Sequence, residues 1–253
     1  MTNDSKHALS KVPEVTLIFW IIKIAATTLG ETAGDAVSMS MNLGYLMGTV
    51  IFAAAFLIAV ATQIRANKFH PFVYWATIIA TTTVGTTLAD FADRSLGIGY
   101  AGGATLLFAL LIASLFTWYK SLGSIAVDTV SSPKEEMFYW VTIMFSQTLG
   151  TALGDWTADT AGLGYAGGAL VFSLLLGCVI AAYYWTSLSR ALLFWAAFIL
   201  TRPLGAVVGD FLDKPLSDGG LALSRYSASA VIILIIIACI LSFPQRAGTK
   251  STR

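Results

Sequence analysis

Four aspartates recur at matching positions in this chain, each inside a long apolar stretch. Each follows a glycine by five residues and a tryptophan by fifteen; they are Asp35, Asp90, Asp155 and Asp210. Because a carboxylate inside hydrocarbon is costly, such a residue is read first as functional. Four carboxylates at one depth would bind a cation or relay protons. The structural alternative is that each aspartate caps the next helix or bonds backbone freed at the break between helices.

The residues beside these aspartates predict a site for a hard cation. Hydroxyl and carboxylate oxygens suit Mg²⁺, Ca²⁺, Mn²⁺ or alkali ions better than soft metals. We expect Glu31 to join the aspartates in binding cations and protons, with Asp35 and Asp155 as candidate metal ligands. The supporting polar residues lie in adjoining turns: Thr28, Thr83, Thr86, Thr148, Thr151, Gln147 and Arg202. We expect no organic cofactor; a bound metal or alkali cation is the alternative.

Two charged residues distinguish the first and last copies of the motif. If the motif helices surround an axis, these copies are neighbours and Glu31 pairs with Arg202. Such a pair either fixes helix register or makes Arg202 a tethered cation that substrate or a proton releases. Lys23 follows Trp20 by three residues, so we expect it to snorkel to the membrane interface.

Further acids follow the main aspartates, and two of them adjoin a basic residue. We expect local Asp93–Arg94 and Asp213–Lys214 pairs on a charged outer rim, of which Asp159 and Asp218 are the other acids. The alternative is an outer vestibule that attracts cations.

Small residues recur four apart within the motif and predict close helix packing. The expected packing glycines are Gly30, Gly34, Gly85, Gly150, Gly154, Gly205 and Gly209.

Composition indicates an integral membrane protein that lies in a lipid bilayer. Of the 253 residues 57% are hydrophobic and only 11% are charged, against about 25% charged in soluble domains. A net charge of +1 argues against a nucleic-acid partner. The first fifteen residues lack the apolar segment of a signal peptide. We find no nucleophile–base pair and no nucleotide-binding loop, so we expect no enzyme.

Apolar stretches pair into four two-helix units, at 15–66, 71–120, 136–188 and 191–244, between tails at 1–14 and 245–253. Each unit opens with an aromatic residue followed by tryptophan. Two spans per unit return the chain to the same side, so all copies point the same way. We therefore predict an all-α fold of eight transmembrane helices. The four repeats would form a pseudo-symmetric bundle about the membrane normal.

Lysine and arginine predict the orientation. Ten lie in the tails and the loops between units, and three (Arg94, Lys214 and Arg225) lie in the loops within units. The positive-inside rule then places both termini in the cytoplasm, with the aromatic–tryptophan dyads at the cytoplasmic interface as an aromatic belt.

The motif Thr-Thr-Leu-Gly-Glu-Thr-Ala-Gly-Asp at 27–35, with Leu-Gly-Tyr at 43–45 and degenerate copies of both, resembles a family of uncharacterised bacterial membrane proteins. That family has a four-fold repeat of unknown function and is described as membrane-anchored. The resemblance covers about 15–245 and implies a polytopic inner-membrane protein. Glu31, Gly34 and Asp35 are also loosely similar to the Gly-Asp motifs of bacterial manganese and other cation exporters.

These observations favour a secondary transporter, a cation exporter or cation/proton antiporter, whose partners are inorganic cations and protons. One alternative is a cation channel, since parallel repeats about the membrane normal suit a pore. Another is a structural or sensory membrane protein that carries no flux. Glycine-rich faces leave room for a homodimer.

Overall fold

The computed structural model describes residues 10–248, and this part of the chain forms eight α-helices. They are α1 (Leu17–Asp35), α2 (Gly44–Arg65), α3 (Pro71–Asp90), α4 (Tyr100–Leu122), α5 (Pro133–Asp155), α6 (Gly164–Trp185), α7 (Arg190–Asp213) and α8 (Arg225–Ser242). Seven of them are long and apolar enough to cross a membrane, and α5 is the exception. The described chain is therefore that of an all-helical, multi-pass membrane protein.

The predicted tails extend beyond the described residues. Lys6, Lys250 and Arg253, which entered the orientation argument, lie outside them.

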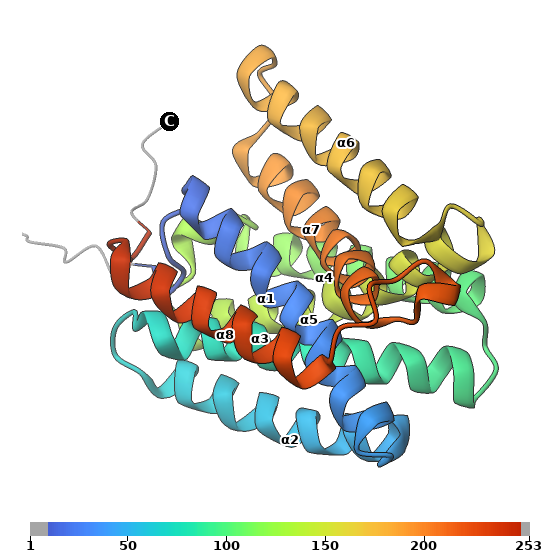
Figure 1. Ribbon diagram of the computed structural model, residues 1–253. Helices are drawn as coiled ribbons and strands as arrows, with labels where there is room; N and C mark the ends of the chain where they lie inside the picture. Colours follow the sequence, from blue (N-terminus) through green and yellow to red (C-terminus); the bar gives the residue numbers. More distant parts are fainter. Residues whose placement is uncertain (1–9, 249–253) are drawn as a thin grey trace, which may run out of the picture.

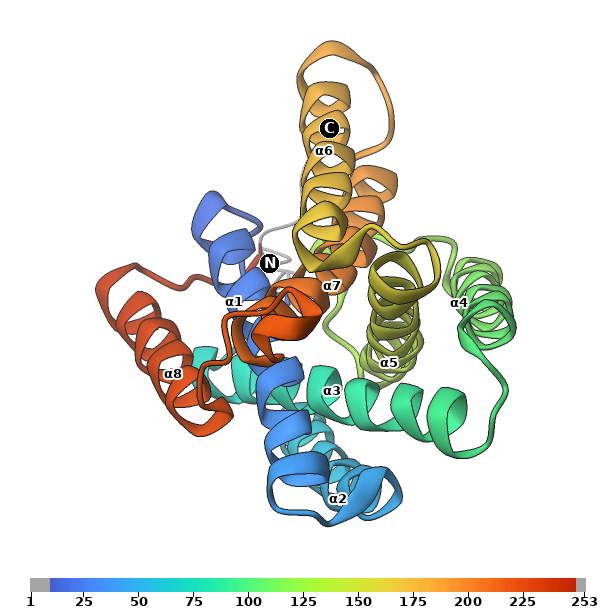
Figure 2. The same cartoon turned by 45° about the vertical axis from the view of Figure 1, so that its right-hand side comes forward.

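The first helices of the four units form a closed inner ring. α1 packs on α3, α3 on α5, α5 on α7, and α7 returns to α1. Figure 2 shows these helices at the centre. α3 is seen from the side, whereas α5 is seen almost end-on, so the two helices cross steeply. Steep crossing of this kind is typical when ridges of residues four apart interdigitate.

The second helix of each unit packs mainly against the first helix of the next unit. α2 lies on α3, α4 on α5 and α6 on α7, while α8 closes the circle on α1 (Figures 1 and 2). These outer helices bury little of their surface: in α2 only Gly48 and Gln63 are buried. Helices that are apolar on nearly every side are suited to contact with lipid.

The motif glycines form the contacts around the ring. A side chain at any of them would overlap or crowd the residue three before the glycine in the next unit, pairing Gly30 with Thr82, Gly85 with Gln147, Gly150 with Arg202 and Gly205 with Thr27. One turn later, Gly34 faces Thr86 and Gly209 faces Glu31. Because both partners advance by four, neighbouring inner helices run in the same direction.

Residues four apart on the inner helices build five buried layers. We call them the aromatic layer (Phe19, Tyr74, Tyr139, Phe194), the collar layer (Lys23, Ile78, Ile143, Phe198), the arginine layer (Thr27, Thr82, Gln147, Arg202), the glutamate layer (Glu31, Thr86, Thr151, Ala206) and the aspartate layer (Asp35, Asp90, Asp155, Asp210). Every one of these side chains is buried. The interior is thus aromatic toward the chain termini and polar toward the other end, which we call the aspartate end.

The aromatic–tryptophan dyads correct one expectation. They do not form a belt at the membrane interface but pack on one another inside the bundle, where Tyr74 is 0% and Trp75 1% exposed. The Tyr74 and Tyr139 hydroxyls lie 2.6 Å apart in a hydrogen bond. Eleven helical residues separate the first aromatic from the motif glycine, which brings the two within about 20° of one direction. The dyads therefore face inward with the glycines.

Lys23 corrects a second expectation, because it does not snorkel. Its side chain is fully buried in the collar layer, with Nζ 3.5 Å from the Thr201 hydroxyl. On α1 it lies on the same inward ridge as Phe19 and Thr27, which are four residues to either side and also buried.

The N-terminal segment covers the termini end of the bundle. Lys11 forms a 2.6 Å ion pair with Glu136 and donates to the Ile64 carbonyl at the end of α2. Pro13 bridges to Ala247, so both ends of the described chain meet here.

Candidate functional site

Three inner helices change their winding directly after the motif aspartate. α1, α3 and α5 continue as five-residue π-helical turns, η1 (Ala36–Ser40), η2 (Phe91–Ser95) and η4 (Trp156–Thr160). α7 instead remains α-helical to Asp213. Asp35, Asp90 and Asp155 make no side-chain capping bond at these junctions. Capping therefore does not account for them, and π-turns are frequent at functional sites.

Two of the aspartates share one arginine. Arg94 lies 2.8 Å from the carboxylate of Asp90 on its own helix and 3.5 Å from that of Asp155 on α5. Both carboxylates are buried, whereas the Arg94 side chain is 34% exposed.

The other two aspartates share one lysine. The Lys214 amine lies 2.5 Å from Asp35 and 3.1 Å from Asp210, and its side chain is 10% exposed. Arg225 lies 3.6 Å from Asp35 and pairs with Asp213 at 3.0 Å. This second carboxylate pair therefore has more cationic partners than the first.

The two bridging cations correct the expected local pairs. Arg94 and Lys214 do not form ion pairs with Asp93 and Asp213, the residues directly before them. Each bonds back to the aspartate four residues earlier, because residues four apart are neighbours on a helix while adjacent residues diverge. The two cations are 120 residues apart, which is also the interval between Asp90 and Asp210.

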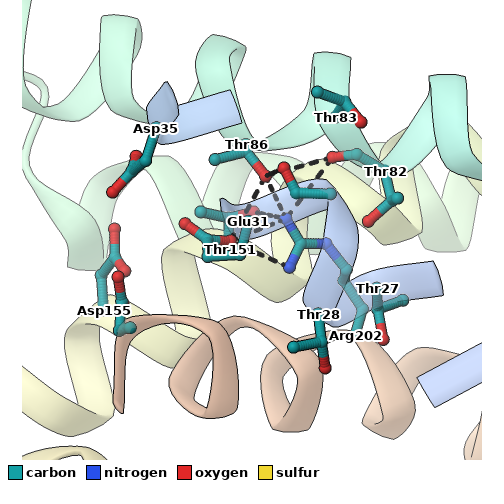
Figure 3. Close-up of polar contacts among 12 residues, drawn as sticks. Thr27, Thr28, Glu31, Asp35, Thr82, Thr83, Thr86, Thr151, Asp155 and Arg202 are labelled. Atoms are coloured by element: carbon teal, nitrogen blue, oxygen red, sulfur yellow. Dashed lines mark hydrogen bonds and ion pairs between the residues drawn. The ribbon is translucent and has the colours of Figure 1, made fainter. Parts of the chain in front are cut away.

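Arg202 connects the glutamate layer across the ring. Its side chain is 0% exposed and donates to Glu31 at 3.1 Å, confirming the expected contact. The Thr86 hydroxyl accepts at 2.6 Å and the Thr151 hydroxyl at 2.5 Å. Figure 3 shows these partners converging on the guanidinium. One arginine thus joins the same position of the three other repeats.

The remaining supporting residues divide into two groups. The hydroxyls of Thr28, Thr83 and Thr148 donate to backbone carbonyls of their own helices, which leaves them outside the charged network. The side-chain amide of Gln147 is buried and has no hydrogen-bond partner within residues 10–248, and the same holds for the Thr82 hydroxyl.

Three-carboxylate groups suited to a cation occur twice among the described residues. Glu31, Asp35 and Asp90 form one, and Asp35, Asp210 and Asp213 the other, with ligand oxygens within 4.8 Å of one another. Asp35 belongs to both groups and Asp155 to neither, so the expected Asp35–Asp155 pair is not a ready-made metal cluster. In Figure 3 these two carboxylates nonetheless point toward one another.

A hollow of about 410 Å³ opens beside the aspartate layer. Its lining includes Arg94, Lys214 and Arg225, with the acids Asp159 and Asp218. The cations that bridge the buried aspartates therefore also border the hollow. Burial acts to lower the pKa of Lys214, but the carboxylates of Asp210 and Asp35 outweigh it and raise that pKa above its usual value.

Sequence reasoning missed Arg94, Lys214 and Arg225 as members of the site. The four-residue spacing from Asp90 to Arg94 and from Asp210 to Lys214 was a usable signal. Arg225 had a weaker one, since it stands where the other units have glycine before tyrosine.

Fold and site together define a multi-pass helical membrane protein built from four repeats around a charged interior. The family model described as Repeat of Unknown Function (DUF347) matches at residues 18–69, 73–123, 138–189 and 193–246, so the chain belongs to that family. No curated protein and no solved structure matches the chain. The looser similarity to cation exporters finds no support in these comparisons.

Proposed function

We propose that this protein is a secondary transporter, a cation exporter or cation/proton antiporter of the bacterial inner membrane. The observation that carries the proposal is the aspartate layer, in which four buried carboxylates on four helices lie beside an open hollow. A cation bound there would have oxygen ligands on one side and solvent on the other.

In the proposed arrangement all eight helices cross the membrane, with the four repeats parallel about its normal. α5 is the eighth span, because α3, α4 and α7 pack around it and shelter its polar residues. Both termini lie in the cytoplasm. The three basic residues in the loops within units do not oppose this orientation. Arg94, Lys214 and Arg225 each form an ion pair with a buried acid, which accounts for their position on the non-cytoplasmic side.

The charge balance of the network favours a cationic substrate. Its contacts join six carboxylates (Glu31, Asp35, Asp90, Asp155, Asp210 and Asp213) to four cations (Arg94, Arg202, Lys214 and Arg225). With every group ionised, two negative charges remain. One divalent cation, or two monovalent cations or protons, would balance them.

The interior supports a carrier rather than a channel. Toward the termini the aromatic layer fills the ring, and Lys11 with Glu136 lies beyond it. The aspartate layer is therefore approached from one side only, as alternating access requires.

Reconstituted liposomes that hold a pH-sensitive dye test this proposal. We would add Na⁺, K⁺, Cs⁺, Mg²⁺, Ca²⁺ or Mn²⁺ and expect an internal pH change for a subset of these cations. Asp155→Asn should abolish the change. Glu14→Gln, which neutralises an exposed carboxylate at the opposite end, should retain it. A flat response to all six from folded protein would contradict the proposal.

One observation favours a structural or sensory protein without flux. All four aspartates already lie within ion-pair distance of internal cations, and such pairs can serve to fix helix register. In that case Asp155→Asn would lower stability, and none of the six cations would protect the wild type against unfolding.

A further inference from the structure

Lys23 is the one charged residue in an otherwise apolar layer of the described bundle. The equivalent positions in the other units are Ile78, Ile143 and Phe198, and all four side chains are 0% exposed. The collar layer separates the aromatic layer, on the side of the chain termini, from the polar layers toward the aspartate end. A basic group at this level therefore lies between the closed end and the charged network.

The Lys23 amine has no acidic partner among the described residues. Its Nζ lies 3.5 Å from the Thr201 hydroxyl and 4.1 Å from the centre of the Phe198 ring. Every other buried basic residue that contacts the network is paired with a carboxylate, as Arg202 is with Glu31.

Few other charged or titratable groups face this amine. α7 presents Arg202 one layer away, and α1 itself carries Glu31 two layers away, where Arg202 already engages it. α3 and α5 present Tyr74 and Tyr139, whose hydroxyls bond each other. α8, which packs on α1, contributes the partly buried Cys239.

An ammonium in these surroundings would be unstable. A buried charge without a counter-ion is strongly destabilising, and such a group usually loses its charge instead. The positive charge of Arg202 adds to that cost. Thr201 and Phe198 can hold a neutral amine, whose nitrogen lone pair is then free to accept a proton.

We propose that Lys23 is neutral in this conformation and is the proton-binding group of the exchanger. This inference rests on the proposed transport function. A proton from the termini side adds to the Nζ lone pair when the aromatic layer opens, forming the ammonium. When the layer closes, the ammonium has no counter-ion there, so Nζ gives the same proton to water admitted from the aspartate end, where the hollow opens, and the amine is neutral again. Cations would then be bound at the aspartate layer and protons at the collar layer.

The first test compares wild type with Lys23→Met in reversible unfolding across pH, in mixed micelles. A lysine that is neutral when folded takes up one proton on unfolding, so stability rises with pH. We expect the unfolding equilibrium constant of the wild type to fall about tenfold per pH unit relative to Lys23→Met, up to about pH 10. A constant ratio at every pH would overturn the proposal, because it would show that folded Lys23 keeps its proton.

Two further variants keep this result interpretable. Lys23→Ile copies the residue of the second and third units and replaces Lys23→Met should that variant fold poorly. Lys120→Met removes an exposed lysine at the end of α4 and should show no pH-dependent difference from the wild type.

The second test measures transport by Lys23→Met with the same six cations. We expect cation uptake without the internal pH change that the wild type shows. A full pH change in this variant would overturn the assignment of Lys23 as the proton site. Should the wild type transport none of the six, the transport proposal fails, while the unfolding experiment still determines the charge of Lys23.

Discussion

The glutamate and aspartate layers are neighbours on the same helices, yet they hold their cations differently. Arg202 is 0% exposed and is bonded by groups from three other helices. Arg94 is 34% exposed, bridges two aspartates and borders the hollow. A fully enclosed guanidinium cannot leave without stranding its partners, whereas one beside solvent can turn outward. The first contact therefore fixes the ring, and the second is suited to exchange.

Arg202→Met should produce the largest effect, because it leaves the buried Glu31 carboxyl without its counter-ion, either as a costly buried charge or as a neutral acid without its arginine partner. We expect the free energy of unfolding to fall by about 3–5 kcal/mol. Reversible unfolding in mixed micelles would measure it. The double variant Arg202→Met/Glu31→Gln should recover part of the loss, since it removes the stranded charge. Unchanged stability of Arg202→Met would contradict the view that the glutamate layer is held more rigidly than the aspartate layer.

Lys214→Met should have an intermediate effect. The amine is 10% exposed and bridges Asp35 and Asp210, so its loss should cost about 1.5–3 kcal/mol, the range for hydrogen bonds to charged groups. The same unfolding measurement applies. A loss as large as that of Arg202→Met would mean that the aspartate layer is as rigidly held as the glutamate layer.

Arg94→Met should cost about 1–2 kcal/mol, less than Arg202→Met, because water already reaches a third of the Arg94 side chain and can hydrate the two buried carboxylates that it leaves. Its removal frees the Asp90 and Asp155 carboxylates for an incoming cation. If the proposed transport holds, we therefore expect whichever of the six cations the wild type carries to protect this variant against unfolding more strongly than it protects the wild type. Weaker protection would show that Arg94 helps to bind the substrate rather than competing with it.

The smallest effect concerns the pH dependence of the Lys214 contribution. Since the pKa of Lys214 is raised in the folded protein, its stabilising effect is complete below the unfolded value of about 10.4 and is lost as pH rises through the folded value. The stability difference between wild type and Lys214→Met should then stay constant from about pH 7 to 10. A difference that declines within that range would contradict the raised pKa.

The repeated features of this chain are predictable from its sequence, and the non-repeated contacts are less so. Spacing alone predicts that the four aspartates share one layer and that Glu31 is a neighbour of Arg202. It does not place Lys23, because a short distance from Trp20 suggests snorkelling, whereas the inward ridge shared with Phe19 and Thr27 decides the outcome. The four-residue spacing of Phe19, Lys23 and Thr27 is visible in the sequence. That these residues face the interior follows only from how the inner helices cross.

The bridging cations escape prediction for a related reason. Adjacent Asp213 and Lys214 suggest a local pair, yet helical geometry directs Lys214 to Asp210 and the ring then brings Asp35 within reach. Packing of each outer helix on the next unit likewise has no local signal, since α2, α4 and α6 are apolar on most sides and fit either neighbour.

That packing of each outer helix on the following unit has a consequence for assembly. A single two-helix unit cannot cover its own first helix, because its second helix lies on a different partner. Two units together still leave the face of α1 uncovered, because the helix that packs on α1 is α8 of the fourth unit. Pro13 and Ala247 are in contact, so the first and last units are also neighbours in the ring. The smallest complete form of this repeat is therefore four units, whether one chain or separate copies supply them.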